Sequence, residues 1–319
     1  MLLRPAPLHI PDGFLSPIVA IVGWILAIIF ITIAIRQTKD QLGEKQVPLM
    51  GILAAFIFAA QVINFPVAGG TSGHLLGGAL AAIVVGPWGA TLIMSAVIGV
   101  QALLFQDGGL LVMGWNIVNM GVITAFSGYA AYTLLLRGIG EGKAARIAAA
   151  FAAGWFSVQI AAIATAVELA VSGTSPLQLV LPAMVGVHMV IGLGEGMITA
   201  AAVGVIQASR PDILIMGERA PGRVGAVFSV VGLVIALLVT LFSPLAAPSP
   251  DGLERIAEDI GFLMLSQDPA FEIFSNYALP FIGGEALATI LAIMVGTLIV
   301  FGLAWIIART LAVREAAGD

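Results

Sequence analysis

Three histidines, His9, His74 and His188, are the side chains of this 319-residue sequence that are best suited to chemistry. Neutral imidazole is the commonest protein ligand for transition metals. The sequence contains no cysteine, which excludes thiolate metal sites, disulfides and cysteine nucleophiles. The pattern therefore favours a metal site built from nitrogen ligands. The simpler alternative is that each histidine makes a hydrogen bond between two helices.

The first histidine lies in the stretch PLHIPDGFLSP, residues 7–17, directly before a long apolar run. Pro11, Asp12 and Gly13 predict a turn, because glycine adopts positive φ without strain. Asp12 is suited to two roles. It accepts hydrogen bonds from free backbone N–H groups, or it orients an imidazole that binds the metal.

The second histidine lies in GGTSGHLLGG, residues 69–78, where glycines allow the backbone to approach a ligand closely. A packing face of small residues is the alternative. Further polar groups lie in apolar segments, where such groups are costly and tend to be functional. We expect Asn116 and Asn119 to hydrogen-bond the ligand imidazoles. His188 and Glu195 are seven residues apart and share a helix face, which predicts a packing or gating network.

Membrane helices are the elements that must position these residues. The sequence is 60% hydrophobic and 10% charged, against about 25% charged in soluble domains. Apolar runs reach the roughly 20 residues that span a bilayer as a helix, and strand alternation is absent. The predicted fold class is an all-α integral membrane bundle of about nine spans, the third and fourth forming a tight hairpin at Gly86-Pro87. The expected ranges are 17–35, 47–64, 72–86, 88–105, 110–136, 146–171, 177–208, 224–246 and 284–308.

Positive charges set the predicted orientation, because Lys and Arg near span ends favour the cytoplasmic side. With nine spans, eleven of the thirteen Lys and Arg residues fall on one side, and only Arg4 and Arg255 fall on the other. We therefore expect the N-terminus outside and the C-terminus in the cytoplasm. All three histidines then lie in the outer half of the bundle.

Residues 247–283 form the one sizeable stretch expected outside the membrane, with six acidic side chains and one basic side chain. Asp251 is a predicted N-cap with Glu254 three residues later, as in a capping box. An apolar stripe within residues 253–260 predicts a short amphipathic helix. We expect the acidic surface to concentrate cations near the histidines, the alternative being an ordinary solvated loop.

The motifs HIPDGFLSP, GGTSGHLLGG and HMVIGLGEGMIT (residues 188–199) resemble the cobalt and nickel substrate-binding components of energy-coupling-factor ABC transporters, the CbiM/NikM type. The resemblance covers about residues 8–215. The stretch PSPDGLERIAEDIGF, residues 248–262, resembles the PDGLE segment of the small partner subunit of these proteins. The sequence therefore predicts an N-terminal extension 1–7, a metal-binding membrane domain 8–215, and a fused PDGLE-type partner domain 216–319 with two spans.

The resemblance implies a metal claw at the N-terminus. In the family, the α-amine, the amide nitrogen of the next histidine and its imidazole bind the metal, and a second histidine adds a fourth nitrogen. The corresponding ligands here are the main-chain nitrogen of Leu8, His9 and His74. The supporting polar groups are Asp12, Asn116, Asn119 and His188. Four nitrogens suit Ni(II) or Co(II) rather than Mg or Ca, which prefer oxygen.

Leu8 stands where the family has its initiator methionine. An extension before it replaces the amine by an amide, which is a poorer ligand. We therefore expect translation to begin at Leu8. Proteolytic trimming of the extension, or a different fourth ligand, are the alternatives.

The resemblance also implies an importer whose ATP hydrolysis takes place on other chains, and the sequence contains no G-x-x-x-x-G-K-[ST] motif. The expected partners are a T-type membrane coupling subunit, two ATPase subunits and membrane lipid, with no nucleic acid. Ala20, Gly23 and Ala27 are candidates for contact with the coupling subunit, internal packing being the alternative. We expect a bacterial or archaeal plasma-membrane protein with Ni²⁺ or Co²⁺ as its substrate and no cofactor.

An intramembrane metalloenzyme and a secondary transporter of another solute are the alternative functions. The enzyme lacks support because no H-E-x-x-H motif is present and no acid–base pair is identifiable beside the histidines. The secondary transporter lacks support because no clear internal repeat is visible. The same nitrogens suit nickel and cobalt, so the sequence separates neither the two metals nor their use in cobalamin synthesis or a nickel enzyme.

Overall fold

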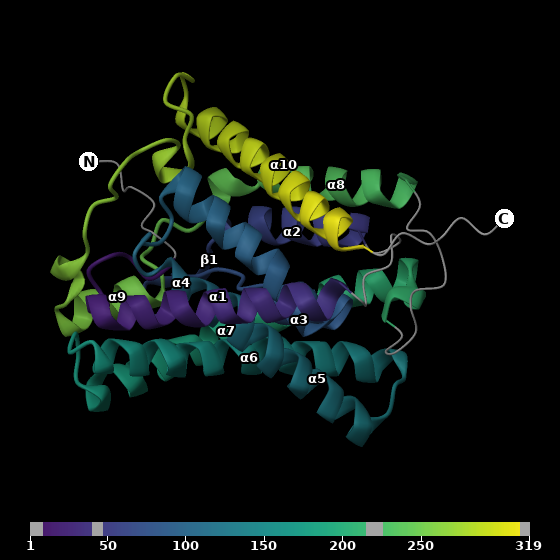
Figure 1. Ribbon diagram of the computed structural model, residues 1–319, viewed down its shortest axis with the longest axis horizontal. Helices are drawn as coiled ribbons and strands as arrows, with labels where there is room; N and C mark the ends of the chain where they lie inside the picture. The colour runs from purple at the N-terminus through teal and green to yellow at the C-terminus, as the bar shows by residue number, and fades with distance from the viewer. Residues whose placement is uncertain (1–8, 40–46, 215–225, 313–319) are drawn as a thin grey trace.

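The computed structural model describes residues 9–39, 47–214 and 226–312. They form a bundle of long helices, with short helices and loops gathered at its ends (Figure 1). The helices are α1 (Pro17–Lys39), α2 (Val47–Gln61), α3 (Gly78–Val100), α4 (Met113–Ile117), α5 (Thr124–Ile139), α6 (Lys143–Val171), α7 (Leu177–Ser209), α8 (Ala226–Thr240), α9 (Gly252–Ile260) and α10 (Glu285–Leu311). The strands β1 (Phe65–Val67) and β2 (Thr71–Gly73) pair as an antiparallel hairpin. Two π-helical turns, Gln101–Phe105 and Val118–Ile123, continue α3 and α4.

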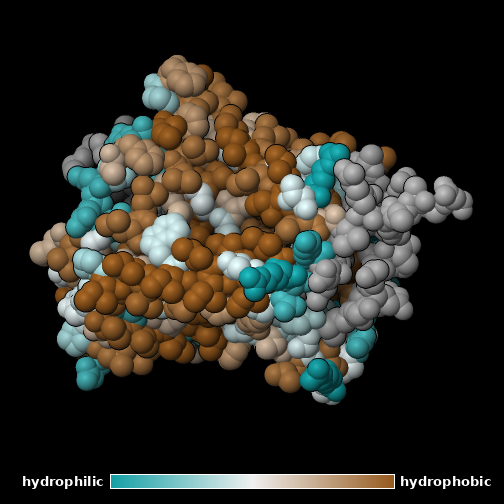
Figure 2. Space-filling view, viewed as in Figure 1, coloured by the Kyte–Doolittle hydropathy of each residue, from teal (hydrophilic) through white to brown (hydrophobic). Residues whose placement is uncertain are grey.

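The bundle has the surface of a membrane protein. Seven helices in the described residues are long and apolar enough to cross a bilayer, counting α4, its π turn and α5 as one. The shorter α2 is apolar and almost wholly buried. Figure 2 shows mainly hydrophobic side chains on the visible face, with hydrophilic side chains gathered toward its ends. The predicted all-α integral membrane class is confirmed.

The predicted third and fourth spans form one broken element, so nine predicted spans correspond to eight apolar helices in the described residues, the seven plus α2. Within α3, Gly86 has non-helical backbone, with φ 79° and ψ 162°. Gln61 binds both ends of the element: its Nε2 donates to Leu76 O (2.8 Å), and its Oε1 accepts from Gln101 Nε2 (2.9 Å). The chain therefore turns back at Gly86 as predicted. However, the first arm, residues 78–85, is too short to span a bilayer.

The β1–β2 hairpin is an element that the sequence analysis does not predict. Its turn contains Gly69 and Gly70, whose positive φ angles of 87° and 75° suit a tight hairpin connection. Ser72 joins β2 to the segment before α9, since its N–H donates to Pro250 O (2.8 Å) and its hydroxyl donates to Ser249 O (2.8 Å). The hairpin therefore connects the first part of the chain to residues 247–283.

The predicted amphipathic helix within residues 253–260 is confirmed as α9. Asp251 is its N-cap, and its Oδ1 accepts from Glu254 N (2.7 Å). Leu253 and Ile256 are buried in an apolar cluster with the N-terminal segment and α7. On the exposed side, Arg255 pairs with Asp259 (3.1 Å). α9 lies at one end of the bundle, and α10 runs from that end toward the opposite one (Figure 1).

The small-residue face of α1 lies inside the protein. Ala20 and Ala27 are 6% and 0% exposed, and Gly23 is also buried. Gly23 packs so closely on Trp115 that a Cβ added to it lies 2.4 Å from Trp115 Cδ1. The indole Nε1 donates to Val19 O (2.6 Å). The structure therefore gives this face the alternative role of internal packing against α4, and does not support the predicted contact with a coupling subunit there.

Candidate metal site

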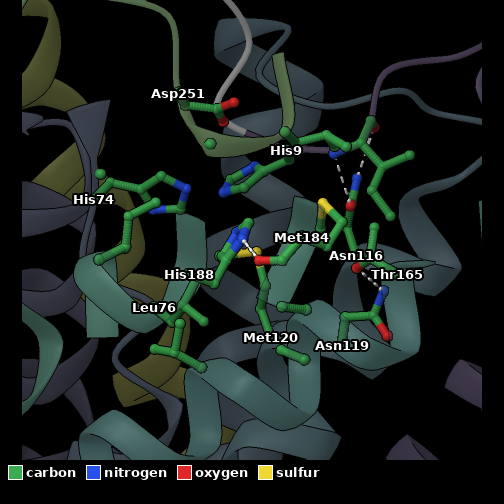
Figure 3. Close-up of a pocket in the computed structure, with 18 residues that line it drawn as sticks. His9, His74, Leu76, Asn116, Asn119, Met120, Thr165, Met184, His188 and Asp251 are labelled. Atoms are coloured by element: carbon green, nitrogen blue, oxygen red, sulfur yellow. Dashed lines mark hydrogen bonds between the residues drawn. The ribbon is translucent and has the colours of Figure 1, made fainter. Parts of the chain in front are cut away.

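A cavity of about 80 Å³ lies at the α9 end of the bundle. His9 enters it from the N-terminal segment, His74 from the β2–α3 loop and His188 from α7. Asp251 lies above the histidines at the start of α9, and the rings of the three histidines face one another (Figure 3). Two thioether side chains, Met120 and Met184, also line the cavity. Segments far apart in sequence therefore converge on the predicted histidines.

Each of the three imidazoles directs Nδ1 at a backbone carbonyl oxygen. The pairs are His9 with Asp107 O (3.2 Å), His74 with Leu75 O (2.9 Å) and His188 with Met184 O (2.7 Å). A carbonyl oxygen only accepts, so Nδ1 carries the proton and Nε2 carries the lone pair. All three rings are thus in a neutral tautomer that binds metals through Nε2.

The pair formed by His9 and His74 is the most enclosed part of the site. Their exposed fractions are 4% and 8%, and their ring centroids are 5.7 Å apart at an interplanar angle of 77°. His9 Nε2 is buried without a hydrogen-bond partner. A buried nitrogen acceptor without a donor is costly, and a bound metal ion would satisfy it. His188 is half-buried and lines the same cavity.

Side chains alone do not complete a metal site in the part of the chain that the structure describes. No group of three or more His, Asp or Glu side chains there is arranged to hold an ion. Leu8, whose main-chain nitrogen is the expected additional ligand, lies outside the described residues. A chelate of an amide nitrogen with its own imidazole uses Nδ1, whereas His9 directs Nδ1 at Asp107. The expected claw therefore requires the His9 ring to turn about its Cβ–Cγ bond.

Asp12 binds backbone rather than an imidazole. Its Oδ2 accepts from Leu110 N (3.0 Å), and its Oδ1 accepts from Leu111 N (2.9 Å) and Val112 N (3.2 Å). These N–H groups lie just before α4, where a helix start leaves backbone donors unpaired. The structure thus selects the structural alternative for Asp12, which ties the N-terminal segment to α4.

Asn116 and Asn119 do not bind the imidazoles as predicted. Asn116 makes two hydrogen bonds with the backbone of Ile10, one to its O and one from its N–H, both 3.1 Å. It thereby holds the residue that follows His9. Asn119 Nδ2 donates to Glu168 Oε2 (2.9 Å) and Thr165 Oγ1 (3.3 Å) in α6. Both side chains line the cavity, but they fix the scaffold.

Glu195 holds the loop that carries His74. It is fully buried in α7, and its two carboxylate oxygens accept from Leu76 N (2.6 Å) and Gly77 N (2.9 Å). Carboxylates bind well at the start of a helix, where backbone N–H groups point outward. Glu195 therefore has the packing role of the two predicted for it, and it does not touch His188 in any hydrogen bond of the described residues.

The sequence analysis does not identify Asp107, Tyr277 or the position of Asp251 over the cavity. Asp107 follows the predicted fourth span by two residues, so an acidic residue next to an apolar run was its available signal. Asp251 is predicted as an N-cap, but its contact with the cavity depends on how β2 binds the segment before α9. Burial raises the pKa of Asp251 to about 8, although the Glu254 N–H bond opposes this shift.

Comparison with known proteins follows the same division of the chain. Residues 9–213 match the family described as the cobalt uptake substrate-specific transmembrane region, CbiM, and residues 226–313 match the PDGLE domain. A putative fused nickel transport protein NikMN of Archaeoglobus fulgidus is 37% identical over 95% of this chain and 98% of that protein. The cobalt transport protein CbiM of Sorangium cellulosum is 34% identical over 65% of this chain and 94% of its own length.

A solved structure supports the same assignment. The crystal structure of a truncated transition metal transporter aligns with a TM-score of 0.58 and 33% identity, over 63% of this chain and 99% of that one. These relatives are metal transport proteins rather than enzymes. The chain therefore belongs to the CbiM family of cobalt and nickel transport proteins, with a PDGLE domain fused behind the CbiM region.

Proposed function

We propose that this chain is the substrate-binding membrane subunit of an ATP-driven energy-coupling-factor importer for Ni²⁺ or Co²⁺. The observation that carries the proposal is the buried His9 Nε2, which has no hydrogen-bond partner and faces His74 in the cavity (Figure 3). Imidazole nitrogens suit these metals, and the cavity excludes bulk water without excluding an ion. The metal is the transported substrate rather than a resident cofactor.

His9 and His74 are the proposed side-chain ligands, and the main-chain nitrogen at position 8 is the proposed additional ligand. The lack of a third suitable side chain among the described residues supports a ligand from the main chain. His188 is the reserve candidate, since its ring lines the same cavity. The proposed domains are 8–215 for metal binding and 216–319 for the PDGLE-type part, in line with the matched ranges.

The proposed orientation places α9 and the cavity on the outer side of the membrane. Among the described basic residues, Arg36, Lys39, Arg146 and Arg309 belong to helix ends remote from α9, whereas Arg255 lies in α9. This distribution follows the positive-inside rule. The metal would then enter from outside, at the end where the acidic 247–283 segment lies.

The proposed partners are a T-type coupling subunit in the membrane and two ATPase subunits. The resemblance to energy-coupling-factor components supports them, as does the absence of a phosphate-binding G-x-x-x-x-G-K-[ST] motif from the sequence. The imported metal would supply cobalamin synthesis or a nickel enzyme. Uptake by this chain alone in vesicles without ATPases would instead identify a secondary transporter.

Metal titration of the purified full chain in detergent tests the proposal. Ni²⁺ and Co²⁺ are titrated into the wild type, His9→Ala and His74→Ala, with Mg²⁺ as the control cation. We expect tight binding of Ni²⁺ or Co²⁺ that each substitution reduces at least 100-fold, and no comparable binding of Mg²⁺. Unchanged binding in both variants contradicts the proposed site.

A second comparison tests the ligand at position 8. One form begins at Met1, and the other begins at position 8 with Leu8→Met. Tighter binding by the shorter form identifies the α-amine as a ligand. Equal binding by both forms excludes it and directs attention to His188.

A further inference from the structure

The orientation of the His9 ring is set by a buried carboxylate. His9 Nδ1 lies 3.2 Å from Asp107 O and 3.4 Å from Asp107 Oδ1, and the two side chains are 0% and 2% exposed. Both oxygens accept only, so they hold the proton on Nδ1 and leave the lone pair on Nε2. Since Nε2 is the ring nitrogen that faces the cavity, Asp107 determines which nitrogen is offered to a metal.

The carboxylate is held in turn by a residue from the PDGLE part. The Tyr277 hydroxyl donates to Asp107 Oδ2 (2.6 Å), in a pair that lies 170 positions apart in sequence. Tyr277 is 5% exposed, and its ring stacks on Phe105 with centroids 4.7 Å apart and an interplanar angle of 16°. Its hydroxyl therefore has a fixed position. Asp107 is oriented from one side by Tyr277 and contacts His9 from the other.

The backbone of Tyr277 shows that its position is imposed by its surroundings. Its φ is +54°, in the left-handed region that residues other than glycine adopt rarely. Such a conformation persists where packing and hydrogen bonds determine it, and it occurs often at functional positions. The neighbouring backbone is also tied to the membrane part, since Phe274 N donates to Leu104 O (2.9 Å).

We propose that Tyr277 and Asp107 are positioning residues that fix the His9 imidazole with Nε2 directed into the cavity, so that docking of the PDGLE part sets the metal-binding form of this histidine. This inference rests on the proposed role of His9 as a ligand. Partners behind a metal-binding histidine fix its tautomer and raise its basicity, and their loss typically costs 10–100-fold in affinity. The PDGLE part then contributes to metal binding without providing a ligand.

The test compares the full chain carrying Tyr277→Phe with the wild type and with Tyr132→Phe. Tyr132 is the matched control because it is 1% exposed and its hydroxyl is buried without a hydrogen-bond partner. Tyr277→Phe keeps the ring that stacks on Phe105. We expect it to weaken Co²⁺ and Ni²⁺ binding about 10-fold and to change the visible absorption spectrum of bound Co²⁺. Tyr132→Phe should change neither.

A second variant, Asp107→Asn, separates positioning from folding. It should alter the Co²⁺ spectrum in the same way, and adding Tyr277→Phe to it should weaken binding little further, because the two residues act through one ring. If Tyr277→Phe leaves affinity and spectrum unchanged while His9→Ala abolishes binding, the inference is wrong and the proposed function stands. If His9→Ala binds metal like the wild type, the proposed function itself fails.

Discussion

The membrane part, residues 9–214, and the 247–283 segment contribute to one cavity in opposite ways. The membrane part provides all three histidines, and buried side chains such as Glu195 and Asn116 hold the segments that carry two of them. The 247–283 segment provides no histidine and is attached largely through its main chain. Its contacts include Ala247 N to Asn64 O (2.8 Å), Ser72 N to Pro250 O (2.8 Å) and Gln267 N to Asp12 O (2.9 Å).

This difference predicts where a substitution is severe. A buried side chain that satisfies two donors cannot be replaced by water, so its loss costs the full desolvation of both. Main-chain contacts survive most side-chain changes, so single substitutions in the covering segment should have smaller effects. The following substitutions test the contrast, from the largest expected effect to the smallest.

Glu195→Ala should have the largest effect. It leaves the N–H groups of Leu76 and Gly77 unpaired in a site where Glu195 is fully buried, at about 1–3 kcal/mol each. We expect the free energy of unfolding to fall by about 3 kcal/mol and Ni²⁺ affinity to fall more than 10-fold, because the His74 loop loses its attachment. Denaturant unfolding in detergent and metal titration measure the two effects.

Glu195→Gln is the control for this prediction. The amide retains one oxygen acceptor of the same shape, so it should lose roughly half as much stability as Glu195→Ala. Equal metal affinity in the wild type and Glu195→Ala would show that the His74 loop keeps its conformation without the carboxylate, and would remove the first half of the contrast.

Gly23→Ala should have the next largest effect, since it places a Cβ 2.4 Å from Trp115 Cδ1 in a buried contact of the membrane part. Overpacking of this kind costs about 1–3 kcal/mol. Gly186→Ala in α7 is the matched control, because an added Cβ meets nothing within 4 Å there and alanine favours a helix. Equal unfolding free energies for the two variants would contradict internal packing of the α1 face.

The contrast also explains which features are predictable from the sequence. The apolar runs, the turn at Gly86 and the N-cap at Asp251 depend on neighbouring residues, and the structure contains all three. The convergence of His9, His74 and His188 follows from their predicted depth in the bundle. These features are visible because periodicity, glycine and capping act over a few residues.

The partners of the histidines are not predictable in the same way. Asn116 binds Ile10 across 106 positions, and Tyr277 binds Asp107 across 170 positions. A pattern in one sequence does not specify which backbone groups such side chains meet. The small residues of α1 show the same limit, because Gly23 suits close contact with a helix of another subunit as well as it suits Trp115.

The covering segment should respond to pH through Asp251. Burial raises its pKa to about 8 from an ordinary value of 3.8, so between these pH values the folded protein holds a proton that the unfolded chain has released. Stability from this group is therefore greatest at low pH and falls as pH rises toward 8, by at most about 1.4 kcal/mol per pH unit. Above pH 8 the dependence should end.

Asp251→Asn checks this dependence, because asparagine is an equally good N-cap and does not titrate. Thermal unfolding of the metal-free full chain is compared at pH 5, 6, 7 and 8. The wild type should lose stability relative to Asp251→Asn as pH rises. A constant difference between the two across this range would mean that Asp251 is not desolvated, and that α9 lies less closely over the cavity.

Ser72→Ala should have the smallest effect. It removes a hydroxyl that donates to Ser249 O (2.8 Å), whereas the Ser72 N–H bond to Pro250 O remains. We expect a loss of about 1 kcal/mol in stability and less than threefold in metal affinity. Ser95→Ala is the control, because its hydroxyl bonds only to Thr91 O within α3. If Ser72→Ala weakens metal binding as much as Glu195→Ala, the covering segment depends on side chains as much as the membrane part does, and the contrast between the two is lost.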